Sequence, residues 1–286
     1  MKKNYKNKAI DLFCNHTKYK PNDIKKITFQ INGYTNKTFH VICKDNKEFI
    51  IRIGVVNDWL NRDNEYYTIK LLKNNNDETI IFYDQKNGDC IKKYLIGKTP
   101  SVRECKTYKF LKLLAAKLKE LHNIRWSKKD KILFNDYHCY DNIKTNINIK
   151  YYKLFYKVLK KYEHYKKVFC HNDLSIWNII YNNKTNKVNF IDFEWARINQ
   201  PYFDIANFIK EGKIHNTKYE DFFIKEYDPN LKKEIIIDFL YVCFFFSLLW
   251  TYSIVPYKNI LNYRERSFQG VLSLYNEITS QSKWKL

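Results

Sequence analysis

The stretch VFCHNDLSIWNIIYNNKTNKVNFIDFEWA, residues Val168–Ala196, decides the fold of this chain. It places Asp173 five residues before Asn178, and it carries a second aspartate, Asp192, at the end of an apolar run. Runs of β-branched and aromatic residues that are bounded by polar ones predict short strands. Three such runs occur here, at 168–169, 179–181 and 188–191. We therefore expect the two acids and the amide on loops, at the ends of strands.

These three polar side chains are a set that phosphoryl transfer can use. Carboxylate and amide oxygens are hard ligands of the kind that Mg²⁺ prefers, and a further carboxylate can accept a proton from a substrate hydroxyl. The interval D-x-x-x-x-N is that of the protein-kinase catalytic loop, where the aspartate is the base and the asparagine holds metal. The alternative is structural, because aspartate also caps turns or forms surface ion pairs, and asparagine also ends strands.

The part of the chain up to Gly97 predicts a small antiparallel sheet with one helix. Alternating apolar and polar residues predict strands within 25–54, 78–84 and 90–97. The expected helix lies within 58–75, where four large side chains share a helical spacing: Trp59, Tyr66, Ile69 and Leu72.

Residues 98–286 predict a larger and mostly helical part. Ser101 and Glu104 have the spacing of a capping box at the start of a helix. That helix continues through apolar positions at helical spacing: Val102, Leu111, Leu114, Leu118 and Leu121. A second helix is expected at 149–167, and further helices from Tyr202 onward. The fold class expected is α+β with two lobes, 1–97 and 98–286.

The order of motifs resembles that of the choline/ethanolamine kinase family, including its bacterial choline-kinase branch. The matching features, in order, are H-N-D-x-x-x-x-N, I-D-F-E followed by an aromatic residue, Asn199, F-D-I-A-N and Glu211. Weaker matches extend from about Ile27 to Asn276. That family shares a protein-kinase-like fold with the aminoglycoside phosphotransferases. The resemblance implies this two-lobed fold and implies ATP and Mg²⁺ as cofactors.

The resemblance also implies roles for the residues of the opening stretch. Asp173 would be the catalytic base, while Asn178 and Asp192 would hold Mg²⁺. His171 is a candidate catalytic residue, and two roles stay open for it: bracing the loop through the backbone, or direct catalysis.

The nucleotide residues implied by the resemblance lie in the first lobe. The segment NGYTNKTFHV takes the place of the phosphate loop, although it has one glycine and no G-x-G-x-x-G pattern, so an ordinary hairpin turn is the alternative. Arg52 takes the place of the strand lysine of protein kinases, and Glu65 could pair with a basic group near the phosphates or be an exposed helix charge. The other implied residues are the phosphate-loop candidates Asn32, Gly33, Thr35 and Asn36 and the adenine hinge Lys93, Tyr94 and Leu95.

A quaternary ammonium substrate needs aromatic faces and carboxylates around it, because it donates no strong hydrogen bond. By resemblance the candidate substrate residues are Glu194, Trp195, Glu211, Trp250, Tyr252 and Tyr263. The family has two tryptophans three residues apart, whereas Trp250 here is followed by Tyr252 two residues later. Because residues i and i+2 do not share a helix face, either one of this pair could line the pocket.

The function expected is an ATP-dependent kinase that phosphorylates choline to phosphocholine. Alternatives within the same fold are an ethanolamine kinase and an aminoglycoside or thiamine-type phosphotransferase. A non-catalytic nucleotide-binding or RNA-binding scaffold that uses the net charge of +21 is the alternative from another class. The intact set of Asp173, Asn178 and Asp192 argues against a scaffold. No block of five consecutive basic residues occurs, so nucleic acid is not the expected partner.

Composition favours a cytoplasmic protein. The seven cysteines are scattered without a C-x-x-C, which argues against a disulfide framework and a zinc site. The N-terminal residues lack an apolar segment of signal-peptide length. Residues 235–255 are nearly long enough to span a bilayer, but Asp238 interrupts them and their aromatics lie in the middle, so we expect a buried core helix. The oligomeric state stays open.

Overall fold

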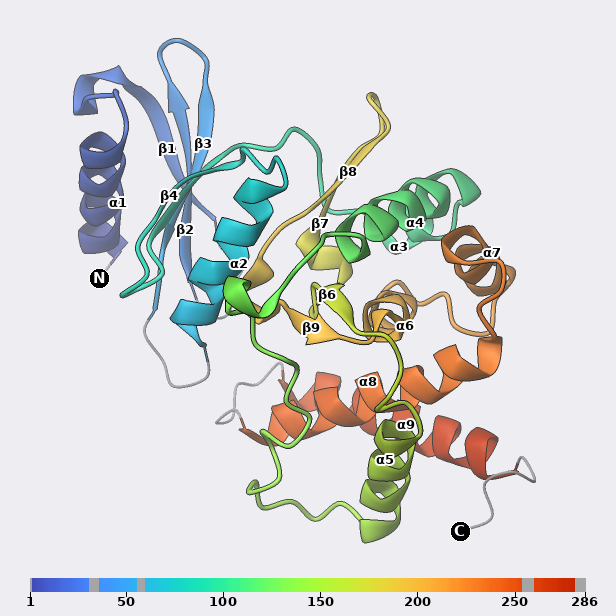
Figure 1. The fold of residues 1–286 in the computed structure, drawn as a ribbon. Coiled ribbons are helices and arrows are strands. Elements are labelled where there is room, and N and C mark those ends of the chain that lie inside the picture. The colour runs from blue at the N-terminus through green and yellow to red at the C-terminus, as the bar shows by residue number, and fades with distance from the viewer. Residues whose placement is uncertain (1, 31–35, 56–59, 254–259, 281–286) are drawn as a thin grey trace. The chain divides into compact units, whose positions relative to one another are not determined.

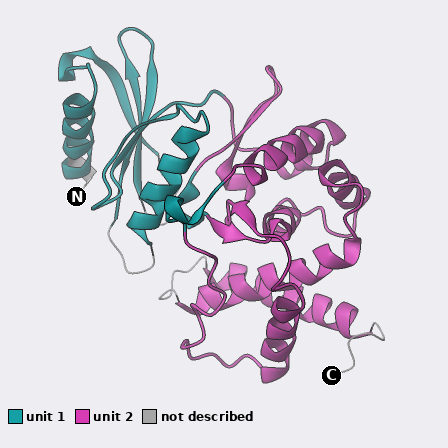
Figure 2. Ribbon diagram, viewed as in Figure 1, with its two compact units in different colours: residues 1–96, 126–132, 192–196 teal, residues 97–125, 133–191, 197–286 magenta. Residues whose placement is uncertain are grey.

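The computed structural model describes residues 2–30, 36–55, 60–253 and 260–280. The chain forms two compact units, which Figure 2 distinguishes by colour. The first unit consists of residues 1–96 with two segments that return to it, 126–132 and 192–196. The second holds residues 97–125, 133–191 and 197–286. The boundary between functional lobes after Gly97 stays a prediction, since the units are defined by packing alone.

The first unit is built on an antiparallel five-stranded sheet, as the sequence predicts. Its strand order is β1-β2-β3-β5-β4. The β2–β3 hairpin turns at Asn46, which has a positive φ of 62°, a backbone conformation that asparagine adopts more readily than most residues. The strands are β1 (Ile24–Gln30), β2 (Lys37–Cys43), β3 (Glu48–Ile53), β4 (Ile80–Tyr83) and β5 (Cys90–Lys93).

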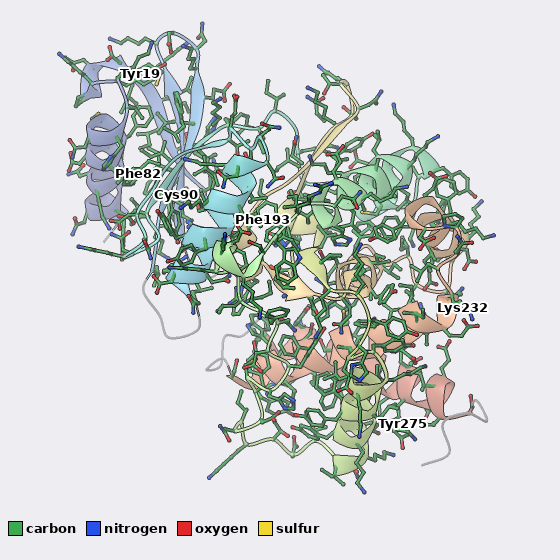
Figure 3. The ribbon with its side chains drawn as sticks, viewed as in Figure 1. Tyr19, Phe82, Cys90, Phe193, Lys232 and Tyr275 are labelled. Atoms are coloured by element: carbon green, nitrogen blue, oxygen red, sulfur yellow. The ribbon has the colours of Figure 1, made fainter. Side chains whose placement is uncertain are left out.

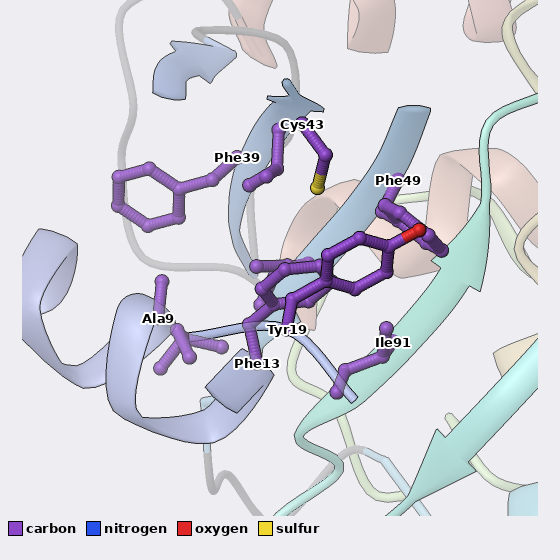
Figure 4. Close-up of a cluster of buried hydrophobic side chains, with 10 residues drawn as sticks. Ala9, Phe13, Tyr19, Phe39, Cys43, Phe49 and Ile91 are labelled. Carbon is purple, nitrogen blue, oxygen red and sulfur yellow. The ribbon is translucent and has the colours of Figure 1, made fainter. Parts of the chain in front are cut away.

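Helix α1 (Lys2–His16) covers one face of this sheet (Figure 1). Its Ala9 and Phe13 are fully buried, and the Phe13 ring packs 5.0 Å from that of Phe49 on β3 (Figure 4). The prediction of one helix in this region was therefore wrong. The apolar stripe of α1 is narrow and surrounded by lysines, so it is recognisable only once the sheet that it covers is known.

Helix α2 (Arg62–Asn74) is the helix that the sequence predicts within 58–75. Ile69 and Leu72 are buried as expected, and Trp59 lies outside the described residues. The Asn61 side chain caps the helix by accepting from the N–H of Asn64 at 2.8 Å. α2 packs against the 3-10 turn η4 (Phe193–Trp195), and through it the segment 192–196 joins the first unit.

In the second unit, the capping box of Ser101 and Glu104 is confirmed, but the helix behind it is not continuous. The Ser101 side chain accepts from the Glu104 N–H, and the Glu104 carboxylate accepts from the Ser101 N–H. The helix that begins there, α3 (Val102–Cys105), ends after one turn. Thr107 then caps a separate helix, α4 (Tyr108–His122), which corrects the prediction of one helix.

The opening stretch forms short strands, as predicted. β6 (Val168–Cys170) pairs with β9 (Arg197–Asn199), and β7 (Ile179–Asn182) pairs with β8 (Lys187–Phe190). The turn η3 (Ile176–Asn178) leads into β7. The other helices of the second unit are α5 (Ile149–Lys161), α6 (Pro201–Glu211), α7 (Lys218–Tyr227), α8 (Lys233–Ser253) and α9 (Ile260–Ser280). A further 3-10 turn, η2 (Lys128–Asp130), belongs to the first unit.

Helix α8 is the apolar segment that raised the question of a membrane span. Among the described residues it is the one helix that is long and apolar enough to cross a bilayer. However, 67% of its most apolar window is buried inside the structure, and the core helix of a soluble protein meets the same criteria. α8 therefore gives only weak support for a span and matches the predicted core helix. All seven cysteines of the chain are free in the structure.

Candidate active site

The loop after β6 brings the acid and the amide of the opening stretch together. The Asn178 side-chain N–H₂ donates to the carboxylate Oδ2 of Asp173 at 2.8 Å and to the main-chain oxygen of the same residue at 2.8 Å. The amide nitrogen of Asn178 therefore points toward Asp173, and Oδ1 is the atom of this side chain that could bind a cation. The interval of five residues is thus the interval that allows one amide to orient one carboxylate.

His171 is fully buried and is bonded on both sides of its ring. Its Nε2 lies 2.9 Å from the main-chain oxygen of Ile191, and its Nδ1 accepts from the Asp173 N–H at 3.3 Å. An oxygen acceptor on one side and an N–H donor on the other define the neutral tautomer with the proton on Nε2. This geometry favours the bracing role for His171 over direct catalysis.

Asp204, in the first turn of α6, fixes the backbone of this loop. Its carboxylate accepts from the main-chain N–H of His171 at 2.7 Å and from that of Asn172 at 2.8 Å. Asn172 has a positive φ of 61°, and Asn199 on β9 donates to its side chain at 3.0 Å. Asp204 and Asn199, which the resemblance matched only as motif positions, are therefore braces of the loop.

His122 completes this brace and is a residue that sequence reasoning missed. Its Nε2 lies 3.1 Å from the Asp204 carboxylate and its Nδ1 lies 2.7 Å from the Tyr227 hydroxyl. His122, Cys170 and Asp204 offer metal-ligand atoms within 4.8 Å of one another. The Asp204 carboxylate already accepts from two main-chain N–H groups of the loop. We therefore interpret the set of His122, Cys170 and Asp204 as structural and not as a metal site.

The first unit contains a buried ionic cluster around Arg52. Because side chains alternate along a strand, Ile51 and Ile53 face α1 while Arg52 points to the other face of the sheet, toward α2. Its guanidinium contacts the Glu65 carboxylate at 2.5 Å and donates through Nε to the main-chain oxygen of Gly88 at 3.1 Å. Both Arg52 and Glu65 are under 5% exposed, so Glu65 is a buried partner and not an exposed helix charge.

Arg62, one turn before Glu65 on α2, is a second cation of this cluster that sequence reasoning missed. It contacts Glu65 at 2.6 Å and the main-chain oxygen of Val55 at 3.0 Å. Gly88 has a φ of 78°, and a Cβ there would lie 2.6 Å from the Arg62 guanidinium, so a larger residue would be strained and would displace the guanidinium. The spacing Arg62-x-x-Glu65 was the available signal, because residues i and i+3 are neighbours on a helix.

Asp192 and Glu194 extend this cluster within the first unit. Asp192 adopts a left-handed conformation with φ 66° and lies 3.5 Å from Arg52. Glu194 is buried and accepts from the Asn36 side chain at 3.1 Å. Burial and the nearby Asp192 raise the pKa of Glu194 from its ordinary value of 4.5 to about 7, although Arg52 opposes the rise. Phe193, labelled in Figure 3, and the half-buried Trp195 complete η4.

The structure describes only some of the other residues that were predicted to bind the nucleotide. Asn32, Gly33 and Thr35 lie outside the described residues. Lys93 and Tyr94 stand at the end of β5, where their N–H groups donate to main-chain oxygens of Thr79 at 2.7 Å and Glu48 at 3.0 Å. The N–H groups of Lys93 and Tyr94 are therefore already bonded within the sheet region of the first unit.

The aromatic candidates of the second unit separate into two groups. The Trp250 ring meets the Tyr263 ring edge-on at 6.0 Å, and the Tyr263 hydroxyl donates to Glu211 at 3.0 Å. Tyr252 instead lies under the Arg264 guanidinium, 4.2 Å from the ring centroid, and donates to Asn146. Of the two alternatives on α8, it is Trp250 that joins Tyr263 and Glu211. A buried cation that the sequence analysis did not single out, Lys210, lies against the same glutamate.

The residues predicted to hold Mg²⁺ have the chemistry for it. Asn178 presents an amide oxygen, and the Asp192 side chain is 40% exposed with one long contact to Arg52 at 3.5 Å. An amide oxygen and an accessible carboxylate are hard donors, as Mg²⁺ requires.

A family model for choline/ethanolamine kinase matches residues 27–243 of the chain. A protein of Mycoplasma pneumoniae described as an uncharacterised MG356 homolog is 28% identical over 98% of this chain and 97% of its own length. Ethanolamine kinase 2 of Rattus norvegicus is 27% identical over 68% of this chain, which spans only 54% of that enzyme. The structure of choline kinase LicA from Streptococcus pneumoniae superposes with a TM-score of 0.72, covering 96% of this chain and 99% of LicA at 18% identity. This last likeness confirms the kinase-like α+β fold.

Proposed function

The chain belongs to the choline/ethanolamine kinase family and is a phosphotransferase with an alcohol acceptor, and from this premise we propose that it transfers the γ-phosphoryl group of ATP to the hydroxyl of choline. The product would be phosphocholine. The observation that carries the proposal is the pair formed by Asp173 and Asn178, with the amide donating to the carboxylate at 2.8 Å.

Asp173 is proposed as the base of this reaction. A carboxylate that is oriented by a fixed amide can accept a hydrogen bond from the substrate hydroxyl and take its proton as the oxygen attacks phosphorus. His171, which is neutral and bonded on both sides, positions this loop, and Asp204 holds the backbone that carries it.

Asn178 and Asp192 are the proposed Mg²⁺ ligands. When bound, Mg²⁺ would neutralise charge on the phosphate oxygens. Arg52 is proposed to serve the phosphates, with its orientation fixed by Glu65 at 2.5 Å. The proposed phosphate loop is Asn32, Gly33, Thr35 and Asn36, and the proposed adenine hinge is Lys93, Tyr94 and Leu95.

The choice of choline rests on the aromatic residues. The Trp250 and Tyr263 rings meet at 6.0 Å in the second unit, and aromatic faces attract a quaternary ammonium. Trp195, Glu194, Glu211 and Tyr252 are the other proposed substrate residues. Ethanolamine is the second candidate because several relatives are ethanolamine kinases. A cytoplasmic location is proposed from the seven free cysteines.

The test is ADP release by the purified protein with ATP and Mg²⁺ and a panel of choline, ethanolamine, thiamine and an aminoglycoside. We expect the highest kcat/KM for choline. Turnover of the aminoglycoside alone would overturn the choice of an amino alcohol. Salt-dependent RNA binding without turnover of any alcohol would instead support the scaffold alternative.

A further inference from the structure

Lys210, at the end of α6, is a buried ammonium with a complete set of partners. Its side chain is 2% exposed. Nζ donates to the Ser247 hydroxyl at 2.6 Å and to the Tyr263 hydroxyl at 3.3 Å, and it lies 3.2 Å from Glu211 Oε1. A lysine ammonium has three N–H donors. Two of them donate to hydroxyls and the charge pairs with Glu211, so the chain itself fills a site that could hold a primary ammonium.

Glu211 is correspondingly occupied by groups of the chain. Its Oε1 also accepts from the Tyr263 hydroxyl at 3.0 Å, and its Oε2 lies 3.4 Å from the Arg266 guanidinium. Burial raises the pKa of Glu211, but Lys210 and Arg266 outweigh burial and lower it overall. Glu211 is thus a carboxylate whose charge is already met by two cations, Lys210 and Arg266.

This matters because amino alcohols differ in what their cation demands. A primary ammonium has N–H groups that cost free energy when they are buried without acceptors. A quaternary ammonium has no such donor and binds to aromatic faces. Lys210 and Arg266 together carry more positive charge than Glu211 neutralises, and this excess weakens the binding of both kinds of cation. The occupation of the Glu211 oxygens weakens only the binding of a primary ammonium, because only that cation needs acceptors.

We propose that Lys210 is a specificity-determining residue: by occupying Glu211, it makes the substrate site favour quaternary over primary ammonium alcohols. This inference rests on the proposed function, in which Glu211, Tyr263 and Trp250 contact the substrate cation. Lys210 acts through Glu211 and the Tyr263 hydroxyl and not on the reacting atoms. Trp250 and Tyr263 then provide the ring faces for the quaternary group.

The experiment compares kcat/KM for choline and for ethanolamine in the native protein and in Lys210→Met. Methionine keeps the length and apolar stem of lysine and removes the ammonium, so Glu211 regains capacity to accept from a substrate. We expect the ratio of choline to ethanolamine to fall about tenfold or more, through a gain for ethanolamine. Lys210→Arg, which keeps the charge, should retain more of the preference for choline than Lys210→Met.

Lys161→Met is the matched control. Lys161 also pairs with a buried carboxylate, Asp238, at 2.7 Å, and its loss changes the net charge by the same amount. The ratio should not change in this variant. If native protein phosphorylates choline and Lys210→Met leaves the ratio where Lys161→Met leaves it, the inference is wrong and the proposed function stands. If native protein phosphorylates neither alcohol, or prefers ethanolamine, the choice of choline fails and the inference fails with it.

A second variant covers the case in which Lys210→Met does not fold, as judged by thermal unfolding. In Lys210→Gln a neutral amide replaces the ammonium and keeps hydrogen-bonding groups for Ser247 and Tyr263. We expect the ratio of kcat/KM for choline to that for ethanolamine to fall about tenfold or more in this variant as well. An unchanged ratio in Lys210→Gln would overturn the inference.

Discussion

The loop around Asp173 and the cluster around Arg52 are held by different kinds of bonds. In the loop, one buried carboxylate, Asp204, accepts from two main-chain N–H groups, at 2.7 and 2.8 Å. In the cluster, long side chains meet as ions: Arg52 and Arg62 contact Glu65 at 2.5 and 2.6 Å. Bonds to the main chain fix where the backbone runs, whereas the cluster fixes charges relative to one another.

This difference has a consequence for how each region fails. Loss of a loop bond frees the backbone, so the position of Asp173, the proposed base, is expected to change first. Loss of one ion from the cluster leaves a buried charge without its partner, which destabilises the folded state itself. Changes at the loop are therefore expected in kcat, and changes in the cluster are expected in stability and its pH dependence.

The largest effect is expected for Asp173→Asn. Without a base the substrate hydroxyl keeps its proton, and kcat should fall about 10³-fold. ATP binding, measured by calorimetry, should stay near native. Asp141→Asn, which removes an exposed carboxylate bonded to His138 at 2.8 Å, is the control and should keep kcat. A variant of Asp173 with most of the native rate would rule it out as the base.

Glu65→Gln is expected to lower stability more than any loop change. It removes the shared anion of Arg52 and Arg62, both under 10% exposed, and breaking a buried ion pair costs about 3 kcal/mol. Denaturant unfolding measures this loss. Glu78→Gln is the control, since its contact with Lys93 is exposed and should contribute little. Equal stability of the two variants would contradict the buried pairing.

Asp204→Asn tests the loop. The amide can keep one of the two main-chain bonds but brings no charge, so we expect a loss of about 2 kcal/mol in the free energy of unfolding. At a temperature where both variants are folded, kcat should be lower in Asp204→Asn than in Glu65→Gln. Asp221→Asn, at an exposed pair with Lys233 on α7, is the control. A normal kcat in Asp204→Asn would show that the loop needs no brace.

The smallest effect expected is the pH dependence that Glu194 imposes on the first unit. Its pKa of about 7 exceeds its ordinary value of 4.5, so the folded state holds this proton more tightly than the unfolded state. The contribution to stability is present below about pH 4.5 and is lost as pH rises through 7. We expect a fall on the order of 1 kcal/mol between pH 6 and pH 8 that Glu194→Gln removes, measured by denaturant unfolding. The same fall in both proteins would assign it to other groups.

The parts of the molecule that were predictable are those whose partners lie close in sequence. The interval from Asp173 to Asn178 is short, so the spacing alone indicates that the two side chains can meet. The capping box of Ser101 and Glu104 was confirmed for the same reason. The α1 helix was missed because its two fully buried residues, Ala9 and Phe13, face strands that come later in the chain.

The sequence by itself determined the family, the α+β fold and the set of acids and amides, because these depend on residue type and on local spacing. Only the tertiary structure decided how charge is distributed around them. Lys210 meets Ser247 and Tyr263 across 37 and 53 residues, and Arg62 joins Glu194 only where α2 packs on η4. Whether a carboxylate is available to a ligand depends on which cations the fold places beside it, and no spacing along the chain records that.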